Sequence, residues 1–482
     1  MTRLAWICLA LAPVAWACTI YDIEGMALLS PKQTIVIGDT VSMVVVDRDG
    51  VMPLRSAVSW SSSDSTVAVI DELGVVRGIG PGVALIGAVT GDYSLTIPMK
   101  VWEPARLVSV AAGGTHTCGL TAAGQALCWG SNTDYQMGNR WAQSKCEWPI
   151  GGLFPCAKSA IPIDSELRFT ALAAGYKHVC GLTAEGSVHC WGLNGSGQLG
   201  DGTTTGRWEP APVEGGHVFR TLEASGSGAC GIAVDGRLLC WGESSSGILG
   251  DSDAHLTPTE VAPALRFDRV ATSGDHVCGV ATTGATWCWG SNSYGQLGID
   301  DVEPACPPGG AVYPCTSDPV EVVDVPPLDR VVVEPLGTCG LTPGGEAFCW
   351  GRNDQGQLGD GTGMDGWQPR AVAGGHTFAT LSAGAAQVCG VEAGSLWCWG
   401  FDAADFGNGG DPSTALEPVV AAGELALRDV SLDINHGCAI APDGVTWCWG
   451  WSGEGALGHG VTDNAIESKP LRVVLFDFDD TY

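Results

Sequence analysis

Paired cysteines are the residues of this chain whose type and spacing point most directly to chemistry. Fourteen of the twenty cysteines form seven pairs whose members are nine or ten positions apart. Paired cysteines serve either zinc binding or disulfide formation. Zinc sites use steps of about two to four intervening residues together with clustered histidines, a pattern that these pairs lack. The spacing therefore favours disulfides over zinc for the seven pairs, which are Cys118 with Cys128, Cys180 with Cys190, Cys230 with Cys240, Cys278 with Cys288, Cys339 with Cys349, Cys389 with Cys398, and Cys438 with Cys448.

Two more pairs, Cys146 with Cys156 and Cys306 with Cys315, lie in the related segments CEWPIGGLFPC and CPPGGAVYPC. Nine short-range disulfides would not persist in a reducing cytosol, so the pairs predict an oxidising compartment. Only Cys8 and Cys18 are left without a partner in this scheme.

The elements that must position the cysteines are seven repeats that end in Trp-Gly. Successive Trp positions differ by 48 to 62 residues, and a period near fifty indicates a propeller or a solenoid. In the first repeat the cysteines flank the turn Ala122-Ala-Gly124, and a hairpin there would set them opposite each other at a separation that a disulfide spans. In the sixth repeat the turn shortens to Ala393-Gly394, and Cys389 and Cys398 are still expected to lie opposite each other. The seven tryptophans are Trp129, Trp191, Trp241, Trp289, Trp350, Trp399 and Trp449.

Four histidines at one repeat position could suggest a ring of metal ligands. The other three repeats carry Gly228, Gly337 and Gln387 there, so we expect a structural hydrogen-bonding role. The repeated Gly-Gln-Leu-Gly-Asp-Gly lacks the Lys-Ser/Thr and the helix of a phosphate loop, and is interpreted as a turn. HExxH and GxSxG motifs are also absent from the sequence. We therefore expect no catalytic residues, no metal and no cofactor. The four histidines are His116, His178, His276 and His436.

Residues 1–17 carry one early charge, a short apolar run and a small-x-small ending, which predicts a secretory signal peptide. The segment Val14-Ala-Trp-Ala-Cys18 resembles a bacterial lipoprotein processing site, although Ala15 stands where Leu is usual. The resemblance implies lipidation of Cys18. The alternative is ordinary cleavage that leaves Cys18 as a free or intermolecular thiol.

Residues 18–103 contain no further cysteine, and strand-like runs alternate with turns every eight to twelve residues, as in a small β-sandwich. The stretch 58–71, which contains Trp60, and the glycine-rich segment 74–84 that follows it resemble the bacterial immunoglobulin-like group-two domain. The resemblance implies a spacer or adhesion module in which Trp60 is a core residue.

Residues 104–482 hold the repeats. Trp-Gly followed by Gly-Gln-Leu-Gly, with His-x-Cys ahead of the hairpin, resembles the regulator of chromosome condensation repeat family, which implies a seven-bladed propeller and an all-β chain. Repeat six departs from the pattern at residues 401–407. Residues 106–112 and 470–475 are expected to be the two halves of one closing blade. The family's best-known role implies guanine-nucleotide exchange on a nuclear GTPase, the alternative function here, whereas exported bacterial members of the fold bind a secreted enzyme.

Charge argues against nucleic acid as a partner. The chain has 53 acidic and 23 basic residues and a net charge of −30, which repels DNA and RNA. We expect a monomeric, non-catalytic protein-binding scaffold of the bacterial cell envelope or a secreted form of it. Its only membrane contact would be the lipid anchor, and its unknown protein ligand would bind a face of the propeller.

The two disulfide-tied insertions, after repeats one and four, are the predicted contact regions. Trp141, Trp148, Phe154 and Tyr313 lie on or beside them, and exposed aromatic side chains are typical interface anchors. The alternative is that these side chains pack beneath their own loops. A loop held by a disulfide loses less entropy on binding.

Overall fold

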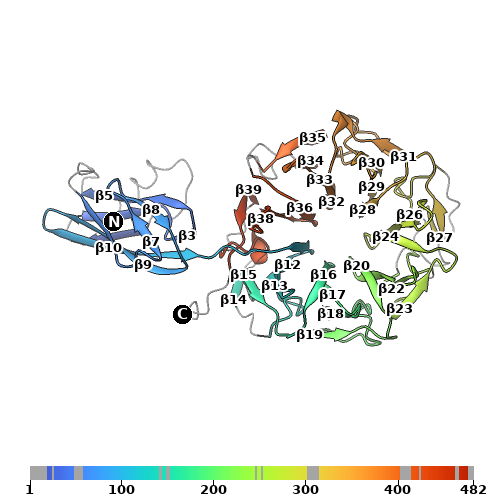
Figure 1. Cartoon of the computed structure of the whole chain (residues 1–482), viewed down its shortest axis with the longest axis horizontal. Coiled ribbons are helices and arrows are strands. Elements are labelled where there is room, and N and C mark those ends of the chain that lie inside the picture. Colours follow the sequence, from blue (N-terminus) through green and yellow to red (C-terminus); the bar gives the residue numbers. More distant parts are fainter. Residues whose placement is uncertain are drawn as a thin grey trace. The chain divides into compact units, whose positions relative to one another are not determined.

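The structure is a computed structural model in which the chain divides into two compact units between Pro104 and Ala105 (Figure 1). Among the described residues, no helix is long and apolar enough to cross a membrane. The structure describes residues 19–23, 26–47, 58–140, 144–147, 152–244, 247–250, 253–300, 314–401, 414–422, 425–461 and 466–475.

The amino-terminal unit consists of three small sheets around one apolar core. Alternating burial along β10 shows that one face of the strand points into this core. Trp60 packs against the same core, as expected. The immunoglobulin-like assignment stays a prediction. The sheets, in strand order, are β1 (Thr19–Ile23), β2 (Met26–Ser30) and β5 (Val44–Asp47); β3 (Thr34–Val36), β10 (Tyr93–Trp102), β9 (Gly82–Thr90) and β6 (Ser59–Ser62); and β4 (Thr40–Ser42), β8 (Val75–Gly78) and β7 (Ala68–Ile70).

The second unit is a β-propeller with seven sheets, called blades 1 to 7 in chain order. Blade 1 has β11 (Ser109–Ala112), β12 (His116–Leu120), β13 (Ala126–Ser131), β15 (Leu153–Pro162) and β14 (Ser144–Glu147); blade 2 has β16 (Phe169–Ala174), β17 (His178–Thr183), β18 (Val188–Gly192) and β19 (Arg207–Pro212); blade 3 has β20 (Phe219–Ser225), β21 (Gly228–Ala233), β22 (Leu238–Gly242) and β23 (His255–Val261). Blade 4 has β24 (Phe267–Thr272), β25 (His276–Ala281), β26 (Thr286–Ser291) and β27 (Cys315–Glu321); blade 5 has β28 (Arg330–Glu334), β29 (Gly337–Leu341), β30 (Ala347–Gly351) and β31 (Gly366–Ala371). Blade 6 has β32 (Thr380–Ala383), β33 (Gln387–Glu392), β34 (Ser395–Gly400) and β35 (Ala415–Ala421); blade 7 has β36 (Asp429–Leu432), β37 (His436–Ile440), β38 (Thr446–Trp451) and β39 (Ile466–Arg472). Two short 3-10 helices, η2 (Ala373–Gly375) and η3 (Gly453–Gly455), lie between strands.

The first strand of each blade lies at the centre of the ring and contacts the first strand of the next blade, with β36 of blade 7 returning to β11 of blade 1 (Figure 1).

The cysteine pairs lie on the two central strands of each blade. Cys118 is directly opposite Cys128, and the Cα atoms are 4.1 Å apart, the close spacing of a pair without hydrogen bonds between its members. The turns also follow the sequence: Gly124 has a φ of 75°, and Ala393 and Gly394 have φ values of 49° and 87°.

All seven predicted blade disulfides are present with the same Cα separation, so the prediction of hairpins that hold the cysteines together is confirmed. The disulfides join Cys118 to Cys128, Cys180 to Cys190, Cys230 to Cys240, Cys278 to Cys288, Cys339 to Cys349, Cys389 to Cys398, and Cys438 to Cys448.

Six of the seven blades are joined to the blade before them by a hydrogen bond from the tryptophan of the repeat. The indole N–H of Trp241 donates a hydrogen bond of 3.0 Å to the carbonyl of Gln198, in the Gly-Gln-Leu-Gly turn of blade 2. A Cβ atom on Gly200 of that turn would lie 2.8 Å from the Trp241 ring, so the close approach requires glycine. The same bond recurs at Trp129, Trp191, Trp289, Trp350 and Trp399. Among the described residues, the buried Nε1 atom of Trp449 has no hydrogen-bond partner, and the repeat before it is the one that departs from the pattern.

This difference predicts a stability effect. Trp241→Phe removes a buried donor and leaves the Gln198 carbonyl unpaired, so we expect it to lower the free energy of unfolding by roughly 1 to 2 kcal/mol more than Trp449→Phe, which makes the same change in volume without losing a hydrogen bond. Chemical denaturation of both variants measures the difference. Equal destabilisation would show that the hydrogen bond contributes nothing.

The prediction that residues 106–112 and 470–475 share one blade is wrong. β11 is the inner strand of blade 1, and β39 is the outer strand of blade 7. Each of the seven blades is made of strands that are consecutive in the chain. The beginning and the end of the propeller are instead joined by main-chain hydrogen bonds between blades 1 and 7. The N–H groups of Ala105 and Leu107, which precede blade 1, donate to the carbonyls of Val473 and Gly444. Ala160 of blade 1 donates to Val474. These bonds join the last blade to the first.

Candidate functional site

The insertion after repeat one extends blade 1 outward. β14 and β15 form an antiparallel pair, and the Cys146–Cys156 disulfide, with Cα atoms 5.9 Å apart, ties them together. Phe154 packs with both cysteines and is 5% exposed. Phe154 is therefore buried against the disulfide, as in the packing alternative, and is not an exposed anchor.

The other predicted contact residues, Trp141, Trp148 and Tyr313, lie outside the described residues. The same holds for Cys8, Cys18 and Cys306. Cys315 is disulfide-bonded, which agrees with the second insertion being cross-linked.

A groove lies beside the first insertion, between blade 1 and the outer strand β19 of blade 2. It has a volume of about 440 Å³. Tyr135 and Leu153 are 51% and 62% exposed on its walls. The Arg140 guanidinium lies 4.3 Å from the ring centre of Trp208, where the positive charge faces the π-electrons. We call this the blade 1 groove; its lining residues are Asn132, Tyr135, Asn139, Arg140, Lys145, Leu153, Phe154, Pro155 and Trp208.

The blade 1 groove can take a protein side chain that is apolar or aromatic, with Arg140 and Lys145 supplying positive charge in an otherwise acidic chain. The sequence did not single out Tyr135, Leu153 or Trp208. Tyr135 lies in the turn that matches the Gly-rich motif, where its φ of 69° is unusual for a residue other than glycine. An aromatic residue at that turn position was the signal that could have indicated it.

A second cavity of about 440 Å³ lies at the centre of the ring. Residues of all seven inner strands, or of the turns that follow them, form its wall. We call it the central channel. Its charged residues are Glu223, Glu334 and Asp433, and no Lys, Arg or His is present among the described residues that line it. These three carboxyl groups come from blades 3, 5 and 7 and are far apart in the sequence.

Burial perturbs these carboxyl groups. It raises the pKa of Glu334 to about 8 and that of Asp433 to about 7, because a carboxylate loses its water inside the protein. The protein around Glu223 raises its pKa to about 7 for the same reason, although its side chain keeps contact with solvent in the channel. Among the described residues, no group of three His, Cys, Asp or Glu side chains could hold a metal ion.

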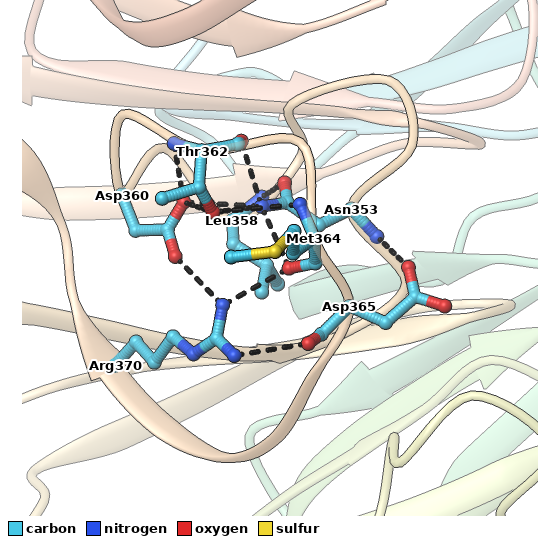
Figure 2. Close-up of polar contacts among 7 residues, drawn as sticks. All are labelled: Asn353, Leu358, Asp360, Thr362, Met364, Asp365 and Arg370. Atoms are coloured by element: carbon cyan, nitrogen blue, oxygen red, sulfur yellow. Dashed lines mark hydrogen bonds and ion pairs between the residues drawn. The ribbon is translucent and has the colours of Figure 1, made fainter.

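The Gly-Gln-Leu-Gly-Asp-Gly segment is a turn, as expected, and Figure 2 shows its hydrogen bonds in blade 5. Asn353 closes the loop: its amide nitrogen donates to Asp360 at 3.0 Å, and its oxygen accepts from the Leu358 backbone at 3.0 Å. Arg370 forms an ion pair of 3.0 Å with Asp360. Burial acts to raise the pKa of Asp360, but hydrogen bonds from Thr362, Arg370 and Asn353 outweigh it and hold the pKa below its usual range. The polar groups of the loop bond to one another, so the loop is structural.

Two of the four histidines bond a threonine side chain of the next blade, as expected of a structural hydrogen-bonding role. His436 Nε2 lies 2.6 Å from Thr117 Oγ1, and His276 Nε2 lies 2.7 Å from Thr338 Oγ1, each across the joint to the next blade. The expectation is wrong for His116, whose buried ring nitrogens have no hydrogen-bond partner among the described residues. His178 faces the main chain of Gly228 in the next blade, and a hydrogen bond there acts to raise its pKa against the larger effect of burial. Burial lowers the pKa of His116 to about 3 and that of His178 to about 4. Burial also lowers the pKa of His276 to about 3 and that of His436 to about 4, so all four rings are neutral at physiological pH.

Known proteins match the repeats. A family model described as "RCC1-like domain" matches residues 86–430. The mitochondrial RCC1 domain-containing protein RUG3 of Arabidopsis thaliana is 34% identical over 138 residues, which are 28% of this chain and 28% of that protein. Human regulator of chromosome condensation is 33% identical over 120 residues, which are 24% of this chain and 26% of that protein. The matched regions thus span about a quarter of these relatives.

Two solved structures share the fold. Prp20p of Saccharomyces cerevisiae, a structure reported with its binding to Gsp1p and histones, has a TM-score of 0.62 at 19% identity, over 75% of this chain and 88% of that one. Human WBSCR16 has a TM-score of 0.60 at 19% identity, over 74% and 92%. At this level of identity the likeness concerns the propeller fold.

Proposed function

The chain belongs to the family of RCC1-like domains, and from this premise we propose that it is a non-catalytic protein-binding scaffold exported to the bacterial cell envelope. A lipid on Cys18 would anchor it, and the propeller would present the blade 1 groove to a protein partner. The scaffold would act as a monomer, without nucleic acid and without a cofactor.

The disulfides carry this proposal. Eight cysteine pairs are bonded in the described residues, one in every blade and one in the first insertion. Cysteines at bonding distance in every repeat can stabilise the propeller only in a compartment where disulfides persist. Such compartments lie outside the reducing cytosol. The net charge of −30 further supports a partner other than nucleic acid.

The blade 1 groove is the surface that best fits a protein partner. Tyr135 and Leu153 expose large side chains to the groove. The Cys146–Cys156 disulfide restrains the strand that carries Leu153, so less conformational entropy is lost there on binding. Arg140 is held over Trp208 and can offer its guanidinium at the rim. The yeast neighbour Prp20p, which binds Gsp1p and histones, supports the use of such a propeller for binding proteins.

The test compares cross-linked partners in intact cells. We expect the wild-type chain in the membrane fraction, cross-linked to a defined protein, and the double variant Tyr135→Ser with Leu153→Ser in the same fraction with at least about tenfold less of that cross-link, since two exposed apolar anchors are lost. Val234→Ser, at an exposed position of a hairpin turn in blade 3, is the matched control and should keep the cross-link.

Cys18→Ala separates anchoring from binding. This variant should leave the membrane fraction and still cross-link to the partner if that partner is also present in the soluble fraction. A wild-type chain found in the cytosol with free thiols would overturn the proposal of export. Equal cross-linking by the double variant would overturn the assignment of the groove.

A further inference from the structure

The blade 1 groove is present because the turn after β13 departs from the other repeats at one residue. Tyr135 stands where five other blades have a glycine with a positive φ. In blade 4 a Cβ atom on that glycine, Gly295, would lie 2.7 Å from the Cα atom of Trp367, on the outer strand of the next blade. Tyr135 has such a Cβ atom, so the corresponding residue Trp208 cannot lie as close to the turn. The five glycines are Gly197, Gly247, Gly295, Gly356 and Gly455.

Tyr135 holds an unfavourable backbone conformation without burying its side chain. Its φ of 69° lies in the left-handed region that favours glycine, and the residue is 51% exposed on the wall of the groove. Backbone strain of this kind is concentrated at binding and catalytic sites. An aromatic residue that keeps this strain and stays half exposed, where glycine would fit, points to contact with another molecule.

The charge of the groove is opposite to that of the chain. Among the described residues that line it, the charged ones are Arg140 and Lys145, and no Asp or Glu is present, although the chain has 53 acidic and 23 basic residues. Lys145 is exposed on the edge strand β14. The Arg140 Nε atom lies 3.4 Å from a carboxylate oxygen of Asp164, and both side chains are partly exposed. The other nitrogens of this guanidinium can therefore donate to a further acceptor.

On the basis of the function proposed above, we propose that the blade 1 groove binds an acidic segment of the partner protein. An apolar or aromatic side chain of the segment enters between Tyr135, Leu153 and Trp208. The Asp or Glu carboxylates beside that side chain accept hydrogen bonds from Lys145 and Arg140. The groove thereby selects for a combination of apolar surface and negative charge.

An anionic membrane surface fits the groove less well, although it offers the same charge. A chain with a net charge of −30 is repelled by an extended surface of like charge. For a short segment in the groove, salt screens the charges that lie farther away than about 8 Å. Lys145 and Arg140 therefore dominate the electrostatic free energy of a short acidic segment, but not that of a membrane.

The experiment is a selection of phage-displayed random peptides on the immobilised, oxidised full chain. We expect the selected peptides to be enriched in Asp and Glu around one aromatic or large aliphatic residue. Fluorescence anisotropy of the most enriched peptide, labelled with a dye, should show binding that weakens as NaCl is added. Lys145→Glu should weaken this binding about tenfold or more, because a like charge replaces an opposite one.

Lys469→Glu is the matched control, because it makes the same change of charge at an exposed position of the outer strand of blade 7 and should leave the affinity unchanged. Tyr135→Gly should weaken binding without lowering the midpoint of thermal unfolding, because glycine removes both the ring and the backbone strain. Thermal unfolding also establishes that each variant is folded.

Selected peptides with no excess of Asp and Glu would overturn the proposal, as would a selection that enriches no peptide, or equal affinity of the wild type and Lys145→Glu. Binding to phosphatidylglycerol vesicles that is lost in Lys145→Glu would assign the groove to an anionic membrane surface instead.

The double variant Tyr135→Ser with Leu153→Ser separates this result from the proposed function. Peptides without an excess of acidic residues that lose binding to the double variant would leave the groove as the partner site and remove only its preference for acidic segments. Acidic peptides that bind the double variant unchanged would contradict the assignment of the groove itself.

Discussion

Removing one blade disulfide, through the double substitution Cys230→Ala and Cys240→Ala, is expected to lower the free energy of unfolding of the propeller by about 2 kcal/mol. Each bridge closes a loop of about eleven residues, for which loop-closure entropy gives roughly 2 to 3 kcal/mol, reduced here because the hairpin already restrains the chain. Both sulfur atoms are buried, since Cys230 is 2% and Cys240 0% exposed. Together the eight described bridges would then exceed the net stability of a typical domain, about 5 to 15 kcal/mol.

Full reduction should therefore unfold the ring at a temperature where the oxidised protein is stable. Chemical denaturation followed by tryptophan fluorescence measures both effects. The double variant Cys146→Ala with Cys156→Ala is the control: it removes a bridge of the same sequence separation at the outer edge of blade 1, in a small cluster with Phe154. We expect it to change the unfolding of the ring little. A reduced chain as stable as the oxidised one would contradict the structural role of the bridges and weaken the case for export.

Glu334→Gln is expected to stabilise the protein at high pH and not at low pH. The pKa of Glu334 is raised by burial from its ordinary value of 4.5 to about 8, so the folded state binds the proton more tightly than the unfolded state. The favourable contribution is fully present below pH 4.5 and is lost as the pH rises through about 8. The variant cannot ionise, so above pH 8 it should be more stable than the wild type by up to about 5 kcal/mol.

Denaturation at pH 5, 7 and 9 gives the slope of this difference. Glu223, Asp433 and the buried histidines titrate alike in both proteins, so the comparison isolates Glu334. Glu346→Gln should follow the wild type at every pH, because the site is exposed on a hairpin turn. A constant difference between Glu334→Gln and the wild type would mean that only the packing of the amide had changed, and that Glu334 is not buried as a proton-binding group.

The hairpins could be predicted from sequence because their determinants are local. Two cysteines at a fixed separation across a turn containing Gly124 can meet only in one register, and the repeat shows this seven times. The hydrogen-bond partners of the histidines could not be predicted from the residues around them in the sequence. His436 finds Thr117 on the next blade, whereas the residue that corresponds to Thr117 is Val179 for His116. One repeat position thus has two environments, because its partner belongs to another repeat.

The candidate sites were beyond prediction for the same reason. The blade 1 groove brings Tyr135 and Leu153 against Trp208 of the next blade, and the channel brings together carboxyl groups of three blades. Neither set shares a motif or a spacing. The insertion could be recognised as disulfide-tied, but its sequence did not reveal that β14 would add a fifth strand to blade 1 and place Phe154 beneath it.

The way the chain enters the propeller determines how the ring would carry mechanical load. Ala105 and Leu107 are bonded to Val473 and Gly444 of blade 7 before the chain reaches β11 of blade 1. Tension applied through the amino-terminal unit therefore acts first on the last blade, and pulls on the hydrogen bonds that join the beginning of the ring to its end. A propeller tethered in this way shares the force between two blades, whose disulfides Cys118–Cys128 and Cys438–Cys448 limit how far either hairpin can extend.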